Sequence, residues 1–462
     1  MTTFRRVLAA AVATPLVGLS VFGASDRPAG QRNVLLLVSD DHGLELGCYG
    51  HPVVKTPNLD RLAAEGVRFA NAFATVASCS ASRSVIYTGL HNHANGQYGH
   101  QHDGHNFHTH AHVRSLPGLL KARGYRAGII GKVHVQPPSV YPFEVIGVGA
   151  RNLPAIAKAA REFLTAEPDK PFLLVVGFSD PHRSREGFGD ESEPKGLSVP
   201  SYRPEDVIVP HYLPDTPTVR QELVSYYRAV SRLDAGVGLV LKALKDAGAA
   251  ASTLVLYVSD NGPAFPGAKT TLYDPGIHLP LIVRSPTLKR TGLVNPAMIS
   301  WVDLVPTILE WTGTTAPPEL QGRSFMGILD RENPTGWDTI YASHTFHEVT
   351  MYYPMRAIRT REYKYILNLA HKLDYPFASD LHASPTWQEV LASRGTKLGV
   401  RTVEAYVHRP REELYHLPTD PDEVKNLVGD PAHQKALEAF RAQLKDWQVR
   451  TKDPWVVKYK YE

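Results

Sequence analysis

The stretch Asn33-Val34-Leu35-Leu36-Leu37-Val38-Ser39 is an apolar run that ends in Asp40-Asp41. Such a run predicts a strand that is buried on both faces, as in a parallel sheet covered by helices. Other predicted strands alternate along the chain with predicted helices, and this alternation indicates an α/β fold with a parallel sheet. The predicted strands are 67–74, 126–130, 172–178, 253–258 and 279–284, and the helices are 57–63, 116–121, 153–164, 218–247 and 303–311. Thr56 and Ser115 are expected to cap the first two helices.

Polar residues follow three of these strands at the point where each strand ends. They are Asp40-Asp41, then Asp180-Pro181-His182, then Asp260-Asn261. Ligands of open α/β sheets bind in the crevice at the carboxyl ends of the strands, so these residues are expected to converge on one site.

After about residue 335 the pattern changes to short alternating strands, 355–359 and 363–369, joined by the turn 360–362. A terminal helix is predicted over 431–452. We therefore expect a catalytic domain over 31–335 and a smaller α+β domain with an antiparallel sheet over 336–462.

Composition argues against a nucleic-acid-binding protein and against a disulfide-rich protein. The chain has 462 residues, 43% of them hydrophobic, and a formal net charge of only +4, which gives no overall basic field for nucleic acid. Its two cysteines, Cys48 and Cys79, provide no disulfide framework, although a bond between them stays open as an alternative.

Residues 1–30 have the form of a cleaved signal peptide: Arg5-Arg6, an apolar run from Val7 to Phe22, then Gly23-Ala24-Ser25. The paired arginines indicate a twin-arginine route in a bacterium. We expect a periplasmic or extracellular protein with no membrane span after cleavage. An uncleaved anchor is the alternative.

Asp40, Asp41, Asp260 and Asn261 offer hard oxygen ligands, which suit calcium, with magnesium as the alternative. Taken singly, each of them could equally cap a turn after its strand.

Cationic side chains surround the expected crevice. Lys132 and His134, two apart in Gly131-Lys132-Val133-His134, would share a face of an extended segment and could clamp an anion. Lys269 and Arg83 could add to this clamp, together with a helix start at Cys79. His182 is the candidate proton donor, because histidine titrates near neutrality.

Residues 91–112 contain eight histidines. The tract holds no cysteine and no clear helical pair, so a closed zinc site is not expected within it. We expect a loop near the pocket that supplies one or two substrate contacts, with His93 as the candidate.

The stretch Cys79-Ser80-Ala81-Ser82-Arg83, together with the Ser-Asp-Asp, Gly-Lys-x-His, Asp-Pro-His-Arg and Ser-Asp-Asn-Gly motifs, resembles the type I sulfatases in order and spacing. Within that family the sequence is most similar to the sulfamidases, for instance at Ala94 to Gly99, Val140 to Phe143 and His347 to Met351. The similarity covers residues 32–456. Two departures are an alanine at the middle of the cysteine motif and Lys269 where sulfamidases carry an arginine-bearing loop.

The resemblance implies an alkaline-phosphatase-like sheet between helices and conversion of Cys79 to formylglycine by a formylglycine-generating enzyme. It implies one calcium on Asp40, Asp41, Asp260, Asn261 and residue 79. Arg83, Lys132, His134, His182 and Lys269 fall on sulfate-binding and acid–base positions, and Glu348 and Tyr352 on weaker sugar contacts.

The expected reaction is hydrolysis of the N-sulfate of glucosamine in heparin or heparan-type fragments, with release of sulfate. The alternatives are an O-sulfatase, a phosphonate or phosphate ester hydrolase, and a sulfated-glycan-binding protein without catalysis. The sequence leaves the oligomeric state open, a homodimer included.

Replacing Cys79 with alanine is expected to abolish sulfate release and to leave folding intact, because the nucleophile is lost while a small apolar residue remains. Sulfate release and circular dichroism check this prediction. Near-wild-type release by Cys79→Ala would contradict the assignment of the nucleophile.

Overall fold

The computed structural model describes residues 32–184, 187–189 and 197–459. The predicted signal peptide, 1–30, lies outside these ranges. Within them, none of the helices has both the length and the apolar character that crossing a membrane requires.

An eight-stranded sheet forms the centre of the molecule, with the strand order β4-β3-β5-β1-β6-β7-β2-β8. Its strands are β1 (Asn33–Ser39), β2 (Val67–Phe73), β3 (Arg126–Gly131), β4 (Glu144–Ile146), β5 (Phe172–Gly177), β6 (Thr253–Ser259), β7 (Leu281–Arg284) and β8 (Leu293–Ser300). β1 pairs in parallel with β5 and β6, which confirms that the apolar run from Asn33 is an interior strand.

The sheet is mixed and not wholly parallel, because β7 runs antiparallel to both β6 and β2. The prediction of a parallel sheet is therefore wrong at this strand. A parallel connection needs a crossover, usually a helix packed on the sheet. Between β6 and β7 the chain forms only the four-residue helix α7 (Asp274–Ile277), so the chain returns from the same end of the sheet.

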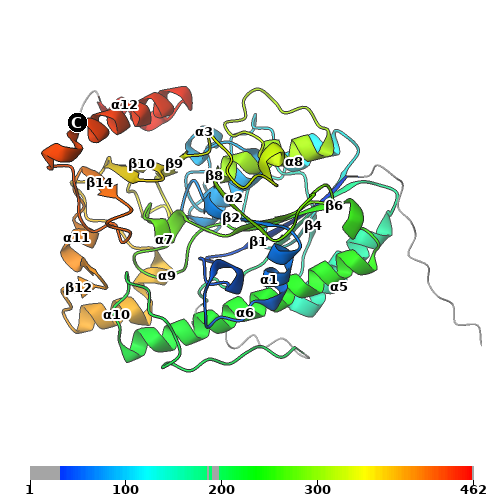
Figure 1. The fold of residues 1–462 in the computed structure, drawn as a ribbon, viewed down its shortest axis with the longest axis horizontal. Helices are drawn as coiled ribbons and strands as arrows, with labels where there is room; N and C mark the ends of the chain where they lie inside the picture. The colour runs from blue at the N-terminus through cyan, green and yellow to red at the C-terminus, as the bar shows by residue number, and fades with distance from the viewer. Residues whose placement is uncertain (1–31, 185–186, 190–196, 460–462) are drawn as a thin grey trace, which may run out of the picture.

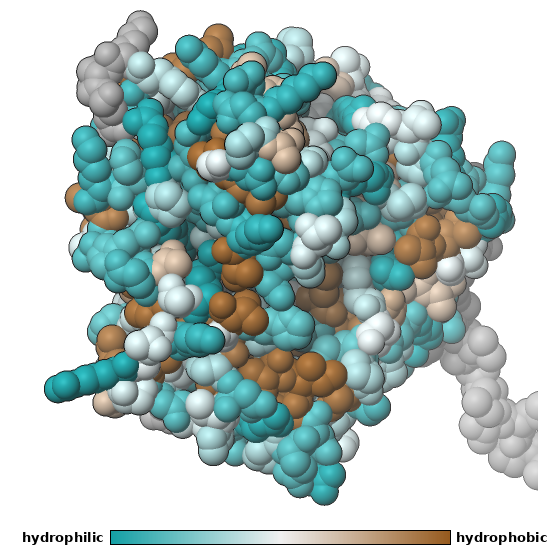
Figure 2. All heavy atoms as spheres, turned by 60° about the vertical axis from the view of Figure 1, so that its left-hand side comes forward, coloured by the Kyte–Doolittle hydropathy of each residue, from teal (hydrophilic) through white to brown (hydrophobic). Residues whose placement is uncertain are grey.

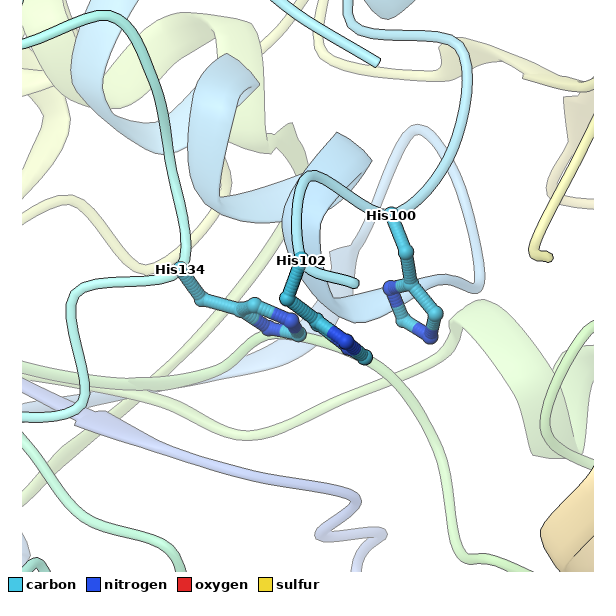
Figure 3. A group of neighbouring side chains, drawn as sticks. All are labelled: His100, His102 and His134. Atoms are coloured by element: carbon cyan, nitrogen blue, oxygen red, sulfur yellow. The ribbon is translucent and has the colours of Figure 1, made fainter. Parts of the chain in front are cut away.

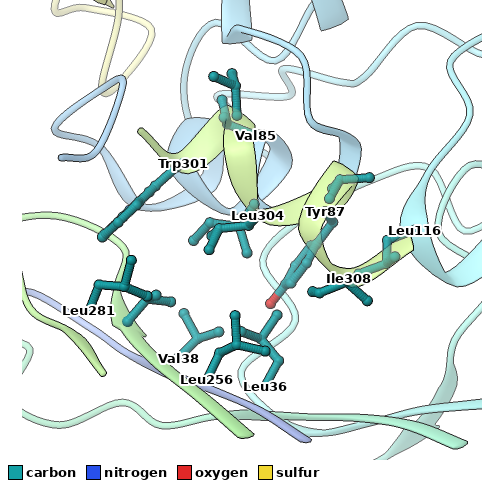
Figure 4. Packing of buried hydrophobic residues seen from close by; sticks show 14 of the residues in the cluster. Leu36, Val38, Val85, Tyr87, Leu116, Leu256, Leu281, Trp301, Leu304 and Ile308 are labelled. Carbon is teal, nitrogen blue, oxygen red and sulfur yellow. The ribbon is translucent and has the colours of Figure 1, made fainter. Parts of the chain in front are cut away.

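Alternate residues of β1 face two separate apolar layers. Val34, Leu36 and Val38 pack in one cluster, which includes residues of α2 (Cys79–Thr88), α4 (Leu116–Lys121) and α8 (Leu304–Thr312); Figure 4 shows part of it. Leu35 and Leu37 pack in the other, with α1 (Pro57–Ala64), α5 (Leu153–Ala166) and α6 (Pro217–Asp246). The two helical layers lie on opposite sides of the sheet in Figure 1.

A second sheet, entirely antiparallel, has the order β14-β11-β10-β9. Its strands are β9 (Thr339–His344), β10 (Met355–Thr360), β11 (Tyr363–Asn368) and β14 (Glu412–His416). The predicted hairpin and its turn are confirmed. α12 (Gln434–Arg450) packs on this sheet through Leu437, Phe440 and Leu444, where Figure 1 shows it at one end of the molecule.

The remaining elements are short. The helices are α3 (Asn92–Asn95), α9 (Ser379–His382), α10 (Pro385–Ala392) and α11 (Val403–Val407), and the strands are β12 (Lys397–Leu398) and β13 (Arg401–Thr402).

Over the face turned forward in Figure 2, hydrophilic side chains predominate and hydrophobic ones form separate patches.

Of the two predicted caps, one is confirmed. Ser115 accepts a hydrogen bond from the N–H of Gly118 at the start of α4. Thr56 does not cap α1, because its hydroxyl accepts from Gly47 and donates to Asp60 instead. The carboxylate of Asp234 takes over the cap by accepting from the N–H groups of Asn58 and Leu59.

A buried ion pair ties the C-terminal end of the chain to the second sheet. Arg356 on β10 donates to both carboxylate oxygens of Asp453, at 2.6 and 2.9 Å, and neither side chain is exposed. The pair holds the pKa of Asp453 well below its usual range: burial opposes ionisation, but the charge of Arg356 outweighs it.

Replacing Asp453 with alanine is expected to lower the free energy of unfolding by about 3–5 kcal/mol, because it leaves the charge of Arg356 buried without a partner. The matched control is Asp446→Ala, which removes an exposed ion pair to Arg450 one helical turn away and should cost less than about 0.5 kcal/mol. Urea unfolding measures both, and equal costs would contradict the reasoning.

Candidate active site

The ends of β1, β5 and β6 meet through backbone contacts. The N–H of Asp40 donates to the carbonyl of Asp180 at 3.2 Å, and the N–H of Asp260 donates to the carbonyl of Ser39 at 3.2 Å. The N–H of Asp41 donates to Oδ1 of Asp260 at 3.2 Å. The predicted convergence of polar residues at this edge of the sheet is therefore confirmed.

Atoms of the kinds that can ligate a metal lie close together at this edge. One ligand atom each of Asp40, Asp41, Cys79 and His182 lies within 4.8 Å of the others. Oδ1 of Asp40 and Oδ1 of Asn261 are both buried, and neither has a hydrogen-bond partner among the described residues. Unpaired buried oxygens are costly, and a hard divalent cation would satisfy both, so the donor set fits such an ion.

The charge balance supports the same fit. Burial, and then repulsion from Asp40, raise the pKa of Asp260. At Asp40, burial opposes ionisation, but the charges of Lys132, His182 and Arg83 outweigh it and hold the pKa well below its usual range. The carboxylates thus repel one another despite the nearby positive side chains, and a bound cation would reduce this repulsion.

Cys79 is the first residue of α2 and is wholly buried. Its Sγ lies 3.8 Å from Oδ1 of Asp41. Ser78 precedes the helix, but its hydroxyl pairs with Nδ1 of His347 at 2.9 Å and does not cap α2. The first-turn N–H groups of the helix are therefore not taken by the Ser78 side chain, and such a helix start can bind an anion.

Two lysines pair with the acidic residues. Lys132, which follows β3, pairs with Oδ2 of Asp40. Nζ of Lys269 lies 2.9 Å from Oδ2 of Asp41 and 2.7 Å from Oδ2 of Asp380. Burial would lower the pKa of Lys269, but Asp380 and Asp41 raise it well above its ordinary value.

Arg83 is buried one turn into α2 and donates to protein oxygens. Its Nε lies 2.8 Å from Oδ2 of Asp260, and its Nη atoms donate to the carbonyls of Lys132 and Ser39. These contacts fix Asp260, whereas the sequence had suggested a clamp on sulfate.

His182 and His134 differ in their surroundings. Nε2 of His182 lies 3.7 Å from Oδ2 of Asp41 and 3.5 Å from Nζ of Lys269. Burial lowers the pKa of His182, and Asp41 partly restores it. His134 follows Lys132 by two residues in the chain, and its ring stacks on that of His102, with ring centres 4.8 Å apart.

Asp380, on the short helix α9, is a residue that the sequence reasoning missed. Asp380 belongs to no motif in the sequence. The region after the hairpin of the second sheet folds back and brings Asp380 to Lys269. Glu348 supports that helix, because its Oε1 accepts from the N–H and the hydroxyl of Ser379.

The two other candidates for substrate contact, Tyr352 and His93, form their hydrogen bonds with residues outside the acidic cluster. Tyr352 accepts a hydrogen bond from the indole of Trp455 at 3.2 Å. His93 is buried, and its ring nitrogens pair with the hydroxyls of Ser343 and Thr451. Since both ring nitrogens are satisfied inside the protein, the expectation that His93 contacts substrate is not supported.

Comparison with known proteins agrees with this geometry. The sulfatase family matches residues 32–144 and 152–314, and a family described as N-sulphoglucosamine sulphohydrolase, C-terminal, matches residues 268–396. The chain therefore belongs to the sulfatase family, and its fold is the alkaline-phosphatase-like fold of that family.

Among individual relatives, the human N-sulphoglucosamine sulphohydrolase is 43% identical over 92% of this chain and 91% of its own length. The N-acetylglucosamine-6-O-sulfatase of Bacteroides thetaiotaomicron is 23% identical over 95% of this chain and 90% of its own. A phosphonate monoester hydrolase from Silicibacter pomeroyi shares the fold, with a TM-score of 0.65, 17% identity, and coverage of 92% of this chain and 97% of that one.

Calcium added to the metal-stripped protein is expected to raise its melting temperature, because an ion that binds only the folded state stabilises it, by about 2.7 kcal/mol at a hundredfold excess over Kd. Asn261→Ala should reduce this gain, since it removes one of the unpaired oxygens. Differential scanning calorimetry measures the shift. The control Asn333→Ala, at an exposed position, should keep the full gain; an equal gain in both variants would argue against the site.

Proposed function

We propose that this protein hydrolyses the N-sulfate of glucosamine in heparin or heparan-type fragments and releases inorganic sulfate. The observation that carries the proposal is the 43% identity to the human N-sulphoglucosamine sulphohydrolase, sustained over 92% of the chain. The arrangement of Cys79, the acidic cluster and the two lysines is what such a reaction on a sulfuryl group requires.

The reaction needs two groups that the unmodified chain lacks. One is formylglycine, made from Cys79, and the other is a cation bound by the acidic cluster. Formylglycine made from Cys79 would supply an oxygen nucleophile, and calcium on Asp40, Asp41, Asp260 and Asn261 would supply positive charge beside it. Burial raises the pKa of the unmodified Cys79 thiol well above its ordinary value. An unmodified thiol here would thus be a weak nucleophile, which supports the need for conversion.

The sulfuryl oxygens are held by Lys132, Lys269 and the first turn of α2. Both lysines are fixed by carboxylates, so their charges are in place before the substrate arrives. Charge that is already oriented costs no reorganisation when the reaction occurs. Arg83 acts through Asp260 as a positioning residue, and His134, two residues after Lys132, contacts the sulfuryl group.

His182 protonates the leaving nitrogen of glucosamine. Its Nε2 sits between the carboxylate of Asp41 and the ammonium of Lys269. Because burial lowers the pKa of His182, its protonated form is a stronger acid than an exposed imidazolium and gives up its proton readily.

An O-sulfatase is the second candidate. Lys269 favours it, since the sequence resemblance associates lysine at this position with other sulfatases and arginine with sulfamidases. The relatives at lower identity include both an O-sulfatase and a phosphonate hydrolase, so the fold alone does not select the reaction.

We also propose that residues 1–30 direct export to the periplasm or the cell exterior, and that a formylglycine-generating enzyme converts Cys79. We propose a division into a catalytic domain over 31–335 and a smaller domain over 336–462. Asp380 of the smaller part reaches Lys269 of the larger one, which is consistent with a site that both parts complete.

Protein co-expressed with a formylglycine-generating enzyme is expected to release sulfate from N-sulfoglucosamine and little from 6-O-sulfated N-acetylglucosamine. Ion chromatography measures both rates, and mass analysis of the peptide with residue 79 verifies the conversion. The reverse preference in converted protein would replace the sulfamidase assignment with an O-sulfatase, and no release from either compound would favour a binding protein.

A further inference from the structure

The histidine-rich tract, taken by itself, lacks a closed set of metal ligands. The structure adds a histidine from elsewhere in the chain. His100 and His102 of the tract meet His134, which follows β3, and one ring nitrogen of each lies within 4.8 Å of the others. The three ring centres are almost equally spaced, at 4.8, 4.8 and 5.0 Å in pairs, and Figure 3 shows the three side chains gathered together.

We propose that His100, His102 and His134 form a second metal site, separate from the acidic cluster, that binds a zinc-class cation. Three imidazoles with an open fourth position are a ligand set that zinc adopts. Imidazole nitrogens favour zinc and its neighbours in the first transition series over calcium and magnesium, which prefer oxygen. The two sites should therefore select different ions.

The contacts of each ring leave a nitrogen for the metal. Nδ1 of His102 lies 2.8 Å from a carboxylate oxygen of Asp103, and ligating histidines commonly pair in this way with an outer carboxylate. Nδ1 of His134 is buried and has no hydrogen-bond partner in the part of the chain that the structure describes.

His100 is oriented by a chain of contacts. Its Nε2 lies 2.9 Å from Nε2 of His347, whose Nδ1 pairs with the hydroxyl of Ser78. If His347 donates from Nδ1, His100 donates from Nε2, and its Nδ1 then carries a free lone pair. Within the described parts of the chain, the one hydrogen bond of that Nδ1 is long, at 3.4 Å, to the hydroxyl of Ser80.

Local charge is compatible with a cation. Burial lowers the pKa of His100 and of His134 well below the ordinary value, so both rings are neutral near pH 7 and can donate lone pairs. The two lysines whose charges act on these rings are both paired with carboxylates, Lys132 with Asp40 and Lys269 with Asp41 and Asp380. A tetrahedral ion that binds nitrogens at about 2.0–2.1 Å holds them about 3.3–3.4 Å apart. The three nitrogens now lie within 4.8 Å of one another, so binding brings them closer by at most about 1.5 Å.

Occupation of this site has a consequence for catalysis that rests on the proposed function. His134 would serve both the metal and the sulfuryl group. An ion that holds the His134 ring would withdraw it from the substrate, so zinc is expected to inhibit sulfate release while calcium remains bound.

The direct test is calorimetric titration of the calcium-saturated protein with zinc. We expect one zinc ion per chain in the wild type. His102→Gln should weaken zinc binding at least tenfold, and Asp103→Asn by a smaller factor through loss of the outer carboxylate. His102 is partly exposed, so its replacement should not disturb folding.

The matched control is His211→Gln, which removes another exposed histidine paired with a carboxylate, Asp422. It should bind zinc as the wild type does. Zinc affinity unchanged in His102→Gln, or lost in Asp41→Asn while intact in His102→Gln, would overturn the proposal by placing the ion elsewhere, and so would the absence of zinc uptake by the wild type.

The inhibition is tested separately with the same variants. Zinc should lower sulfate release by the wild type and by His211→Gln, and much less by His102→Gln, whose activity without zinc should stay near that of the wild type. Zinc uptake without inhibition would support the metal site and remove His134 from the sulfate contacts.

Discussion

Burial of several carboxylates at the carboxyl edge of one sheet is the constraint on which the rest of this structure depends. Asp40, Asp41 and Asp260 are all fully buried. The N–H of Asp41 donates to Asp260, and a carboxylate oxygen of Asp40 lies within 4.8 Å of one of Asp41. Without compensation such a cluster would repel itself and would not ionise fully. Lys132, Lys269 and Arg83 converge on it from separate parts of the chain, and the proposed cation adds the remaining charge.

Much of this architecture could be predicted because its causes are local. The run from Asn33 to Ser39 is apolar at every interior position, and burial on both faces demands that pattern. Asp40, Asp41, Asp260 and Asn261 could be placed together because strand ends in a parallel arrangement share an edge. The start of a helix at Cys79 was also expected from the sequence, and the structure confirms it.

The features that escaped prediction depend on distant contacts. The reversed direction of β7 depends on how the chain between β6 and β7 packs and not on the residues of the strand. Asp380 joins the site because the region after the hairpin of the second sheet folds back onto it. Asp234, on a helix far along the chain, caps α1 in place of Thr56. The group of His100, His102 and His134 joins two loops that no sequence spacing relates.

The burial of α2 also bears on the timing of synthesis. Every residue of this helix is buried, Cys79 included, so an enzyme that modifies residue 79 has to reach it before the helix is covered. One of its partners is Asp260, which follows β6 and pairs with Arg83 of the helix. Asp260 is synthesised about 180 residues after Cys79, and a ribosome that adds about 5–20 residues per second needs about 10–40 s to make that length. Conversion of Cys79 thus competes with folding in a limited interval, and a mutation that speeds packing of the central sheet would lower the fraction of converted molecules without touching the site.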